Sequence, residues 1–352
     1  MIPHPATVDR PAVRRTEGPR VAQMLIGVLV SGFLLWLTVR QIRLADVAAA
    51  LQQANLWYLV PAIVTYFVDL GVRTWRWRVL LSPVRPVRWR DLYPVMTIGY
   101  MSNMLLPARM GEFVRAAVLA RRGVAASAAL GSIATERVLD GLTTVAILLV
   151  ASRFLVLPDW LVAGLVSLTA LFVGVLVALI ALLAGGGRVD AWLEAHGRQA
   201  PLIDRVRALL VQFTTGAGAL RRPRLLVRAI LIGLLAWSCS ALQYFWVFRA
   251  FGLPLGIAAA FFAVSAVGLS SAIPAAPGYV GSFEFVGVAS LGLLGVEPGV
   301  ALSAIMVIHL LQIVPVTVAG MLLAWREGFS LRRYLRRPEG PEGSEVSQHG
   351  AA

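Results

Sequence analysis

The sequence contains no lysine, one cysteine and four histidines, and charged residues make up only 14% of its 352 positions. Without lysine the chain has no Walker-type phosphate loop, and Cys239 has no second cysteine with which to form an internal disulfide. There is also no His/Cys metal constellation and no Gly-x-Ser-x-Gly nucleophile elbow. We therefore expect no metal and no other cofactor, and any transport must use a gradient or facilitated exchange.

Apolar residues are abundant, and they decide the class of protein. They make up 58% of the chain, whereas soluble domains are nearer half apolar and a quarter charged. Long apolar runs recur along the chain, and most reach the roughly 20 residues that a helix needs to cross the hydrocarbon core of a membrane. The first run follows a polar, arginine-bearing segment without a small-residue cleavage site, which predicts an uncleaved first helix and not a signal peptide.

The chain is therefore predicted to be an all-α polytopic membrane protein with about six full spans and two interrupted segments. The interrupted segments, at 91–122 and 257–296, are apolar but are broken in the middle by proline and glycine. Each can be a re-entrant hairpin or two short crossings, and the sequence leaves both open. The predicted full spans are 21–39, 57–79, 128–150, 160–184, 226–250 and 300–324.

All 32 basic residues are arginines, and the formal net charge is +14. They lie mainly between apolar runs, which is typical of the positive-inside rule and of contact with anionic headgroups, and argues against nucleic-acid binding. The pattern predicts a bacterial cytoplasmic membrane protein with both termini in the cytoplasm. It also predicts a basic tail at 1–20, a membrane domain at 21–325 with an amphipathic surface helix at about 188–222, and a basic, then disordered, tail at 326–352.

The membrane domain repeats one order of elements. Residues 21–150 and 160–324 each read span, span, broken hairpin, span, and the two copies start on opposite sides of the membrane. Sequence identity between them is slight, the clearest correspondence being Pro107–Gly111 with Pro274–Gly278. Inverted repeats with paired Gly/Pro-broken segments point to a transport site near the midplane. The alternative is a coincidence of helix order.

The first broken segment carries charged residues beside its break. Pro107 removes a backbone donor and Gly111 permits a tight turn, which is tolerated at membrane depth only inside protein or in a cavity. Arg109, Glu112 and Arg115 follow at three-residue spacing and are predicted to share a helical face. Two guanidiniums around one carboxylate have a net positive charge, which could bind a phosphate. The alternative is an interfacial salt-bridge cluster. The hinge or cavity-lining residues of this motif are Asn103, Pro107 and Gly111.

A second motif lies inside the predicted span 128–150. Glu136, Arg137 and Asp140 are ionisable residues in an apolar run, where they are costly unless paired and are functional candidates by default. Glu136 and Asp140 are i, i+4 neighbours, and Arg137 can bridge to either of them or to Glu112 across helices. The motif predicts a substrate site or an ion-pair lock between spans, and the two roles are compatible.

A third motif breaks the second interrupted segment. Two prolines and two glycines within eight residues stop any helix, and Ser282 is predicted to cap the helix that follows. Such a cap would direct free backbone N–H groups into the cavity, where Glu284 in the first turn complements the helix dipole or acts only as a capping residue. The hinge or cavity-lining residues here are Pro274, Pro277, Gly278, Gly281 and Ser282.

In this order the three motifs resemble those of the lysylphosphatidylglycerol synthase transmembrane family, which includes the flippase half of the bacterial multiple peptide resistance factor. The resemblance covers about residues 20–325. It implies an integral inner-membrane protein with a flippase-like domain and re-entrant segments around a central cavity. The chain ends soon after its last predicted span, without the aminoacyl-transferase domain of the full-length factor. We therefore do not expect it to make lysylphosphatidylglycerol.

These features predict a non-enzymatic transporter that moves a lipid with an anionic or zwitterionic headgroup between leaflets. The arginines would hold the phosphate, the carboxylates would position them or carry a coupling proton, and the breaks at Pro107 and Pro274 would be hinges. Two alternatives are a membrane-embedded enzyme of lipid or lipid-linked glycan modification, and a non-catalytic partner of a separate lipid-modifying synthase. The predicted substrate-binding residues are Arg109, Glu112, Arg115, Glu136, Arg137, Asp140 and Glu284.

Overall fold

The computed structural model describes residues 18–40, 42–106, 109–151, 159–196, 201–270 and 276–326. Within these residues all regular secondary structure is helical, which confirms the predicted all-α class. The α-helices are α1 (Gly18–Val39), α2 (Leu44–Gln53), α3 (Leu59–Leu81), α4 (Trp89–Leu105), α5 (Gly111–Ala120), α6 (Ala126–Ala151), α7 (Asp159–His196), α8 (Pro201–Gly216), α9 (Pro223–Ala250), α10 (Ile257–Ser270), α11 (Ser282–Leu293) and α12 (Pro298–Arg326). Short 3₁₀ helices are η1 (Leu56–Tyr58), η3 (Ala217–Arg221) and η4 (Pro277–Tyr279).

Each predicted full span corresponds to one long helix. In the described part of the chain, four helical segments are long and apolar enough to cross a membrane: Leu56–Leu81, Val162–Gly185, Pro223–Ala250 and Pro298–Arg326. The 26-residue α6 is long enough as well, but it carries the three ionisable residues of the second motif. The polytopic membrane class is thus confirmed.

Both interrupted segments fold back on themselves. α4 packs beside α5, and α10 beside α11. In the first hairpin, the guanidinium of Arg122, after α5, donates a hydrogen bond to the carbonyl of Asp91 in the first turn of α4. The beginning and the end of this hairpin therefore lie together, which fits both a re-entrant segment and two short crossings.

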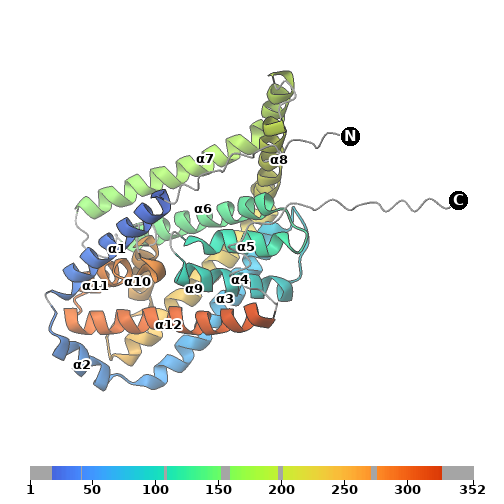
Figure 1. Ribbon diagram of the computed structural model, residues 1–352. Helices are drawn as coiled ribbons and strands as arrows, with labels where there is room; N and C mark the ends of the chain where they lie inside the picture. Colours follow the sequence, from blue (N-terminus) through green and yellow to red (C-terminus); the bar gives the residue numbers. More distant parts are fainter. Residues whose placement is uncertain are drawn as a thin grey trace, which may run out of the picture.

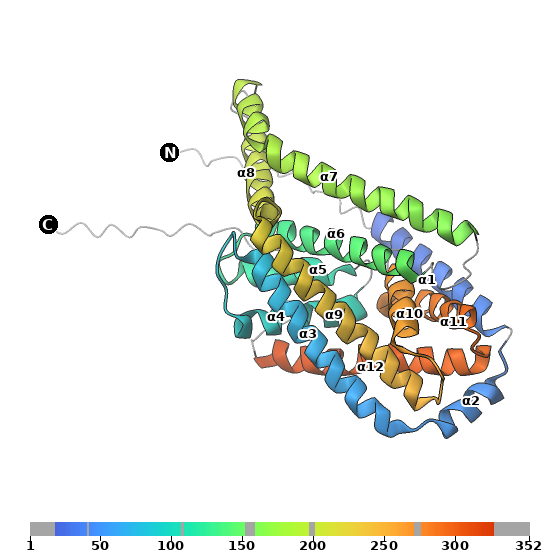
Figure 2. The same cartoon turned by 180° about the vertical axis from the view of Figure 1, so that it is seen from behind.

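The two halves of the chain are intertwined. α3 and α9 lie side by side in opposite directions (Figures 1 and 2), and the N–H of Asn55, before η1, donates to the carbonyl of Ala250 at the end of α9 (2.8 Å). Helix α4 packs on α12, and α10 packs on α6, so that each hairpin contacts the last helix of the other half. The short helices α2 and α8 pack on α12 and α6, respectively.

The predicted surface helix at about 188–222 is wrong in its boundaries. Residues 188–196 continue α7, whose 38 residues extend for about 57 Å, well beyond a membrane core. The rest forms α8 and η3, and Pro201 and Pro223 begin new helices because proline is accommodated in a first turn, where its missing N–H is not needed. α8 also packs closely on α6: a Cβ added to Gly131 would lie 2.0 Å from the carbonyl oxygen of Phe213. The predicted tails at 1–20 and 326–352 lie almost entirely outside the described residues.

Candidate functional site

The break between α4 and α5 is fixed by one side chain and one close helix approach. The amide oxygen of Asn103 accepts the N–H of Gly111 at the start of α5 (2.8 Å). A Cβ on Gly111 would lie 2.0 Å from the carbonyl oxygen of Gly99, so only glycine allows this contact between α4 and α5. Pro107 lies outside the described residues. Asn103 and Gly111 therefore set the geometry of this hairpin tip.

Arg109 does not continue the helix, contrary to the predicted common face with Glu112 and Arg115. Its φ of 54° is in the left-handed region, and α5 begins only at Gly111. Its guanidinium still reaches Glu112 (Nη2 to Oε1, 3.4 Å), whereas Arg115 turns inward to α6. The predicted common face is wrong because the backbone is not helical at Arg109.

The inward-facing pair joins α5 to α6. Arg115 Nη2 lies 2.8 Å from Glu136 Oε2, and both side chains are only 2% exposed. The guanidinium of Arg115 also stacks 4.1 Å from the ring centroid of Trp77, whose indole N–H donates to Ser132 Oγ (3.0 Å). A buried ion pair of this kind is strongly sensitive to the loss of either partner.

A second buried pair joins α3 to α6. Arg76 donates to the carboxylate of Asp140 and to the carbonyl oxygen of Glu136 (3.1 Å), and its side chain is 2% exposed. Arg76 and Trp77 are not among the predicted site residues, because both lie in a run of Arg and Trp that resembles an ordinary membrane interface. The available signal was charge balance: α6 carries two carboxylates and one arginine, so one carboxylate needs a cation from another helix.

The third part of the cluster is partly open. Arg137 Nη2 lies 2.6 Å from Glu136 and 3.5 Å from Asp140, and its Nε lies 3.6 Å from Glu112 Oε1. The side chains of Arg137, Arg109 and Glu112 are 30%, 33% and 22% exposed. In the whole cluster, which we call the arginine cluster, four arginines face three carboxylates. Its members are Arg76, Arg109, Glu112, Arg115, Glu136, Arg137 and Asp140.

Asp69, on α3, forms a separate buried group. Its carboxylate pairs with Arg73 one turn later (2.9 Å), and both side chains interact with the hydroxyl of Ser240 on α9. This group links α3 to α9. Asp69 thus pairs with Arg73, and Arg76 is committed to Asp140.

The second break is held by a carboxylate and a histidine. Glu284 Oε2 accepts the N–H of Gly281 (2.7 Å), and its Oε1 lies 2.5 Å from Nδ1 of His309 on α12. Nε2 of His309 lies 2.7 Å from the carbonyl oxygen of Gly278, and its ring stacks on Phe283 at 4.1 Å. The pair therefore ties the break and the start of α11 to the middle of α12.

Ser282 does not cap α11. The helix begins at Ser282 itself, whose hydroxyl donates to the carbonyl of Tyr279 (3.1 Å), and the residue before the helix is Gly281. Gly281 has a φ of 89°, and a Cβ there would lie 2.3 Å from the carbonyl oxygen of Ser31 on α1, which explains the glycine. Glu284 takes the capping role. Pro277 begins η4, and Pro274 lies outside the described residues.

The two breaks approach each other. η4 packs on α4, and a Cβ on Gly278 would lie 3.4 Å from the carbonyl oxygen of Met104. Tyr279, which has a φ of 61°, lies within electrostatic range of Arg109, Glu112 and Arg137. The open side of the arginine cluster therefore lies near the junction of the two broken hairpins. No metal-binding group of three or more His, Cys, Asp or Glu side chains occurs among the described residues.

These features define a polytopic α-helical membrane protein in which two broken helical hairpins meet beside a charged cluster. The family model for the lysylphosphatidylglycerol synthase TM region matches residues 24–320, and the chain belongs to this family.

The chain is similar in sequence to two proteins from other organisms. The chain is 27% identical over 304 residues to a UPF0104 membrane protein of Methanothermobacter thermautotrophicus, covering 78% of this chain and 87% of the relative. It is also 27% identical over 347 residues to glycosyltransferase AglD of Haloferax volcanii, covering 87% of this chain but only 55% of that relative.

Proposed function

We propose that the protein translocates a lipid with a phosphate-bearing, anionic or zwitterionic headgroup between the leaflets of the cytoplasmic membrane, and that it does so without chemical change to the lipid. The observation that carries this proposal is the state of Arg137. Its guanidinium is held by Glu136 and Asp140, its buried Nε lies 3.6 Å from Glu112 Oε1, and its side chain is still 30% exposed. A partly exposed guanidinium that carboxylates hold in place suits a phosphate oxygen.

The positions of the other arginines divide the predicted site into two layers. Arg137 and Arg109 are the proposed headgroup contacts, because both are partly exposed and both lie beside the partly exposed Glu112. Arg115 and Arg76 are buried and bound to their own carboxylates. We assign them a positioning role, in which they fix Glu136 and Asp140, which in turn aim Arg137.

The architecture supports movement around this site. We propose that residues 21–150 and 160–324 are inverted repeats, as the reciprocal packing of the two hairpins on α12 and α6 favours. In transporters with inverted repeats, broken helices at the repeat interface form the site, and one repeat rocks against the other. The breaks at Gly111 and Gly278 are the proposed hinges.

The test is a leaflet-exchange assay with purified protein in phosphatidylcholine/phosphatidylglycerol vesicles. Wild-type protein is expected to expose an inner-leaflet fluorescent phospholipid to an outside quencher. Arg137→Gln is expected to slow exchange by about tenfold or more, which corresponds to the loss of one charge-assisted contact. Arg249→Gln, which removes an exposed arginine at the end of α9, is the matched control and should leave the rate unchanged. Folded wild-type protein that moves no phospholipid contradicts the proposal.

A second candidate is a membrane component of lipid-linked glycan synthesis, either as an enzyme or as the partner of one. It is favoured by one observation, the similarity to a relative named as a glycosyltransferase, of which this chain covers about half. Product formation by the purified protein, with a lipid acceptor and a sugar donor, distinguishes this candidate, because a translocator leaves the lipid chemically unchanged.

A further inference from the structure

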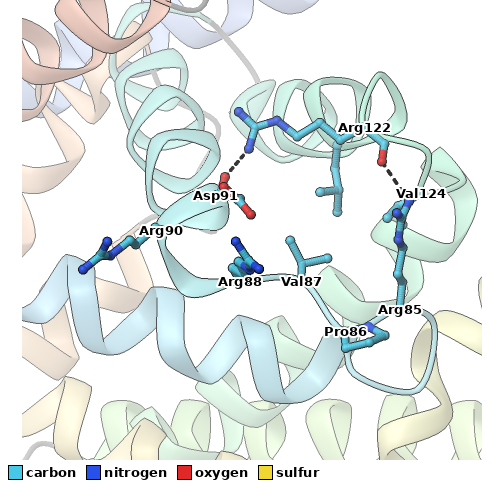
Figure 3. A pocket seen from close by; sticks show the side chains of 9 residues that line it. Arg85, Pro86, Val87, Arg88, Arg90, Asp91, Arg122 and Val124 are labelled. Atoms are coloured by element: carbon cyan, nitrogen blue, oxygen red, sulfur yellow. Dashed lines mark hydrogen bonds between the residues drawn. The ribbon is translucent and has the colours of Figure 1, made fainter.

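A second concentration of arginines lies at the base of the first hairpin, away from its tip. The loop between α3 and α4 and the loop between α5 and α6 enclose a cavity of about 460 Å³ (Figure 3). Four arginines and one carboxylate belong to its lining; the side chain of Arg90 is directed away from it (Figure 3), so three arginines and one carboxylate face the cavity, with a formal charge of +2. The charged lining residues are Arg85, Arg88, Arg90, Asp91 and Arg122.

Two of these arginines form a fixed wall. The guanidinium of Arg122 donates to the carbonyl of Asp91, and that of Arg85 donates to the carbonyl of Arg122 (3.1 Å). Gly123 supports this arrangement, because its φ of 81° is unfavourable for other residues and a Cβ there would lie 2.9 Å from Arg85 Nη1. These bonds to backbone carbonyls hold the two guanidiniums in place at the cavity.

The third arginine has its donors unused. Arg88 immediately precedes α4 and is exposed; its carbonyl accepts the N–H groups of Asp91 and Leu92, whereas its guanidinium makes no hydrogen bond or ion pair with the part of the chain that the structure describes. It lies between Asp91 and Val87 at the cavity, whereas Arg90 points away from it (Figure 3). A preformed basic hollow with an unused guanidinium is what a phosphate needs, since arginine donors match phosphate oxygens in pairs.

We propose that this hollow is a binding site for a phosphate group, separate from the arginine cluster at the hairpin tip. The α4 helix, 17 residues or about 25 Å long, separates the two ends of the hairpin. Trp75 and Trp89, both exposed, lie on the neighbouring parts of α3 and α4, as is typical of side chains at headgroup depth. The phosphate can come from a lipid headgroup or from a soluble phosphate compound. The inference does not depend on lipid translocation.

The test is native mass spectrometry of the full chain in a neutral detergent, with phosphatidic acid as the probe. Arg85→Gln/Arg88→Gln is expected to lower the bound fraction by about tenfold, as the loss of charge-assisted contacts predicts. Arg222→Gln/Arg224→Gln is the matched control, because it also removes two charges from exposed arginines, at the start of α9 near the same end of the molecule. This control should bind as wild type does.

Competition by inorganic pyrophosphate separates the two sources of phosphate. If pyrophosphate displaces phosphatidic acid, the site recognises the phosphate alone. If phosphatidic acid stays bound in the presence of pyrophosphate, and its binding is lost in Arg85→Gln/Arg88→Gln, the site recognises a lipid headgroup. No binding by the wild type, or equal loss in the two double variants, overturns the proposal, since surface charge alone then explains the result. Binding that persists in Arg137→Gln shows that this site is independent of the proposed transport site.

Discussion

The two broken hairpins have a common plan but different chemistry. In each, the chain breaks near a glycine, a non-glycine residue adopts positive φ (Arg109 or Tyr279), and a side chain accepts the N–H of a glycine at the start of the second helix. The first hairpin is then joined to α6 by the Arg115–Glu136 pair, and α6 is joined to α3 by the Arg76–Asp140 pair. The second is joined to α12 by one Glu–His pair.

This difference indicates a division of labour. The first hairpin has both a buried layer of ion pairs and a partly exposed layer, so it can hold a ligand without losing its own structure. The polar groups of the second are saturated: each ring nitrogen of His309 already faces an oxygen, and Glu284 binds both His309 and Gly281. We therefore assign ligand contact to the first hairpin together with Arg137 of α6, and maintenance of the break to the second hairpin.

The largest expected effect is on the buried layer of the first hairpin. Glu136→Gln leaves Arg115 buried without a carboxylate, and should lower the free energy of unfolding by about 3–5 kcal/mol. Arg115→Met should cost less, because Glu136 keeps Arg137 at 2.6 Å. Thermal unfolding of the two variants in detergent measures this asymmetry. Equal destabilisation would show that the two partners of the pair are equally replaceable.

The next effect tests the tip of the same hairpin. Gly111→Ala places a methyl group against the carbonyl of Gly99 and should destabilise the protein by up to about 3 kcal/mol through overpacking. Gly164→Ala is the control: nothing lies within 4 Å of an added Cβ there, and alanine in a helix interior should be neutral or stabilising. A Gly111→Ala protein as stable as wild type would indicate that α4 and α5 can separate freely.

The Glu–His pair of the second hairpin should show a smaller effect. His309→Phe keeps a ring to stack on Phe283 but removes both polar contacts, leaving Glu284 without its partner; the expected loss is about 2 kcal/mol. The measurement compares the thermal unfolding of His309→Phe with that of the double variant Glu284→Gln/His309→Phe, in which no buried carboxylate is left unpaired. Recovery of stability in the double variant supports the pair as the main interaction, and no recovery argues against it.

The smallest effect is expected at the hinge of the second hairpin. Gly278→Ala meets no contact closer than 3.4 Å, so only its φ of 73° is unfavourable, at a cost of about 1–2 kcal/mol. Because this strain lies at a proposed hinge, leaflet exchange should slow although the protein stays folded. An unchanged rate at reduced stability would remove Gly278 from the hinge.

The sequence predicted the helices well because the signal for a span is local: an apolar run of sufficient length. It failed where the outcome depends on contacts between distant residues. The packing of α8 on α6 depends on such contacts. Pro and Gly mark the interrupted segments, but the closure of the first into a hairpin depends on the contact of Arg122 with Asp91.

The residue types of the candidate site could be predicted from the sequence. Which of these residues are buried and which are partly exposed could not. Ionisable residues in an apolar run indicated that Glu136, Arg137 and Asp140 need partners. Spacing alone could not show that Arg115 points inward or that Arg76, 60 residues before Glu136, donates to its carbonyl oxygen. Burial, which separates positioning residues from proposed ligand contacts, is a property of the assembled helices.

The most direct test of the proposed division of labour is photocrosslinking with a phospholipid that carries a diazirine in its headgroup. After illumination in vesicles, peptide mapping of wild-type protein is expected to place adducts at 109–115 and 136–140, and these should disappear in Arg137→Gln. Adducts at Glu284 and His309, or adducts that persist in Arg137→Gln, would contradict the assignment of ligand contact to the first hairpin.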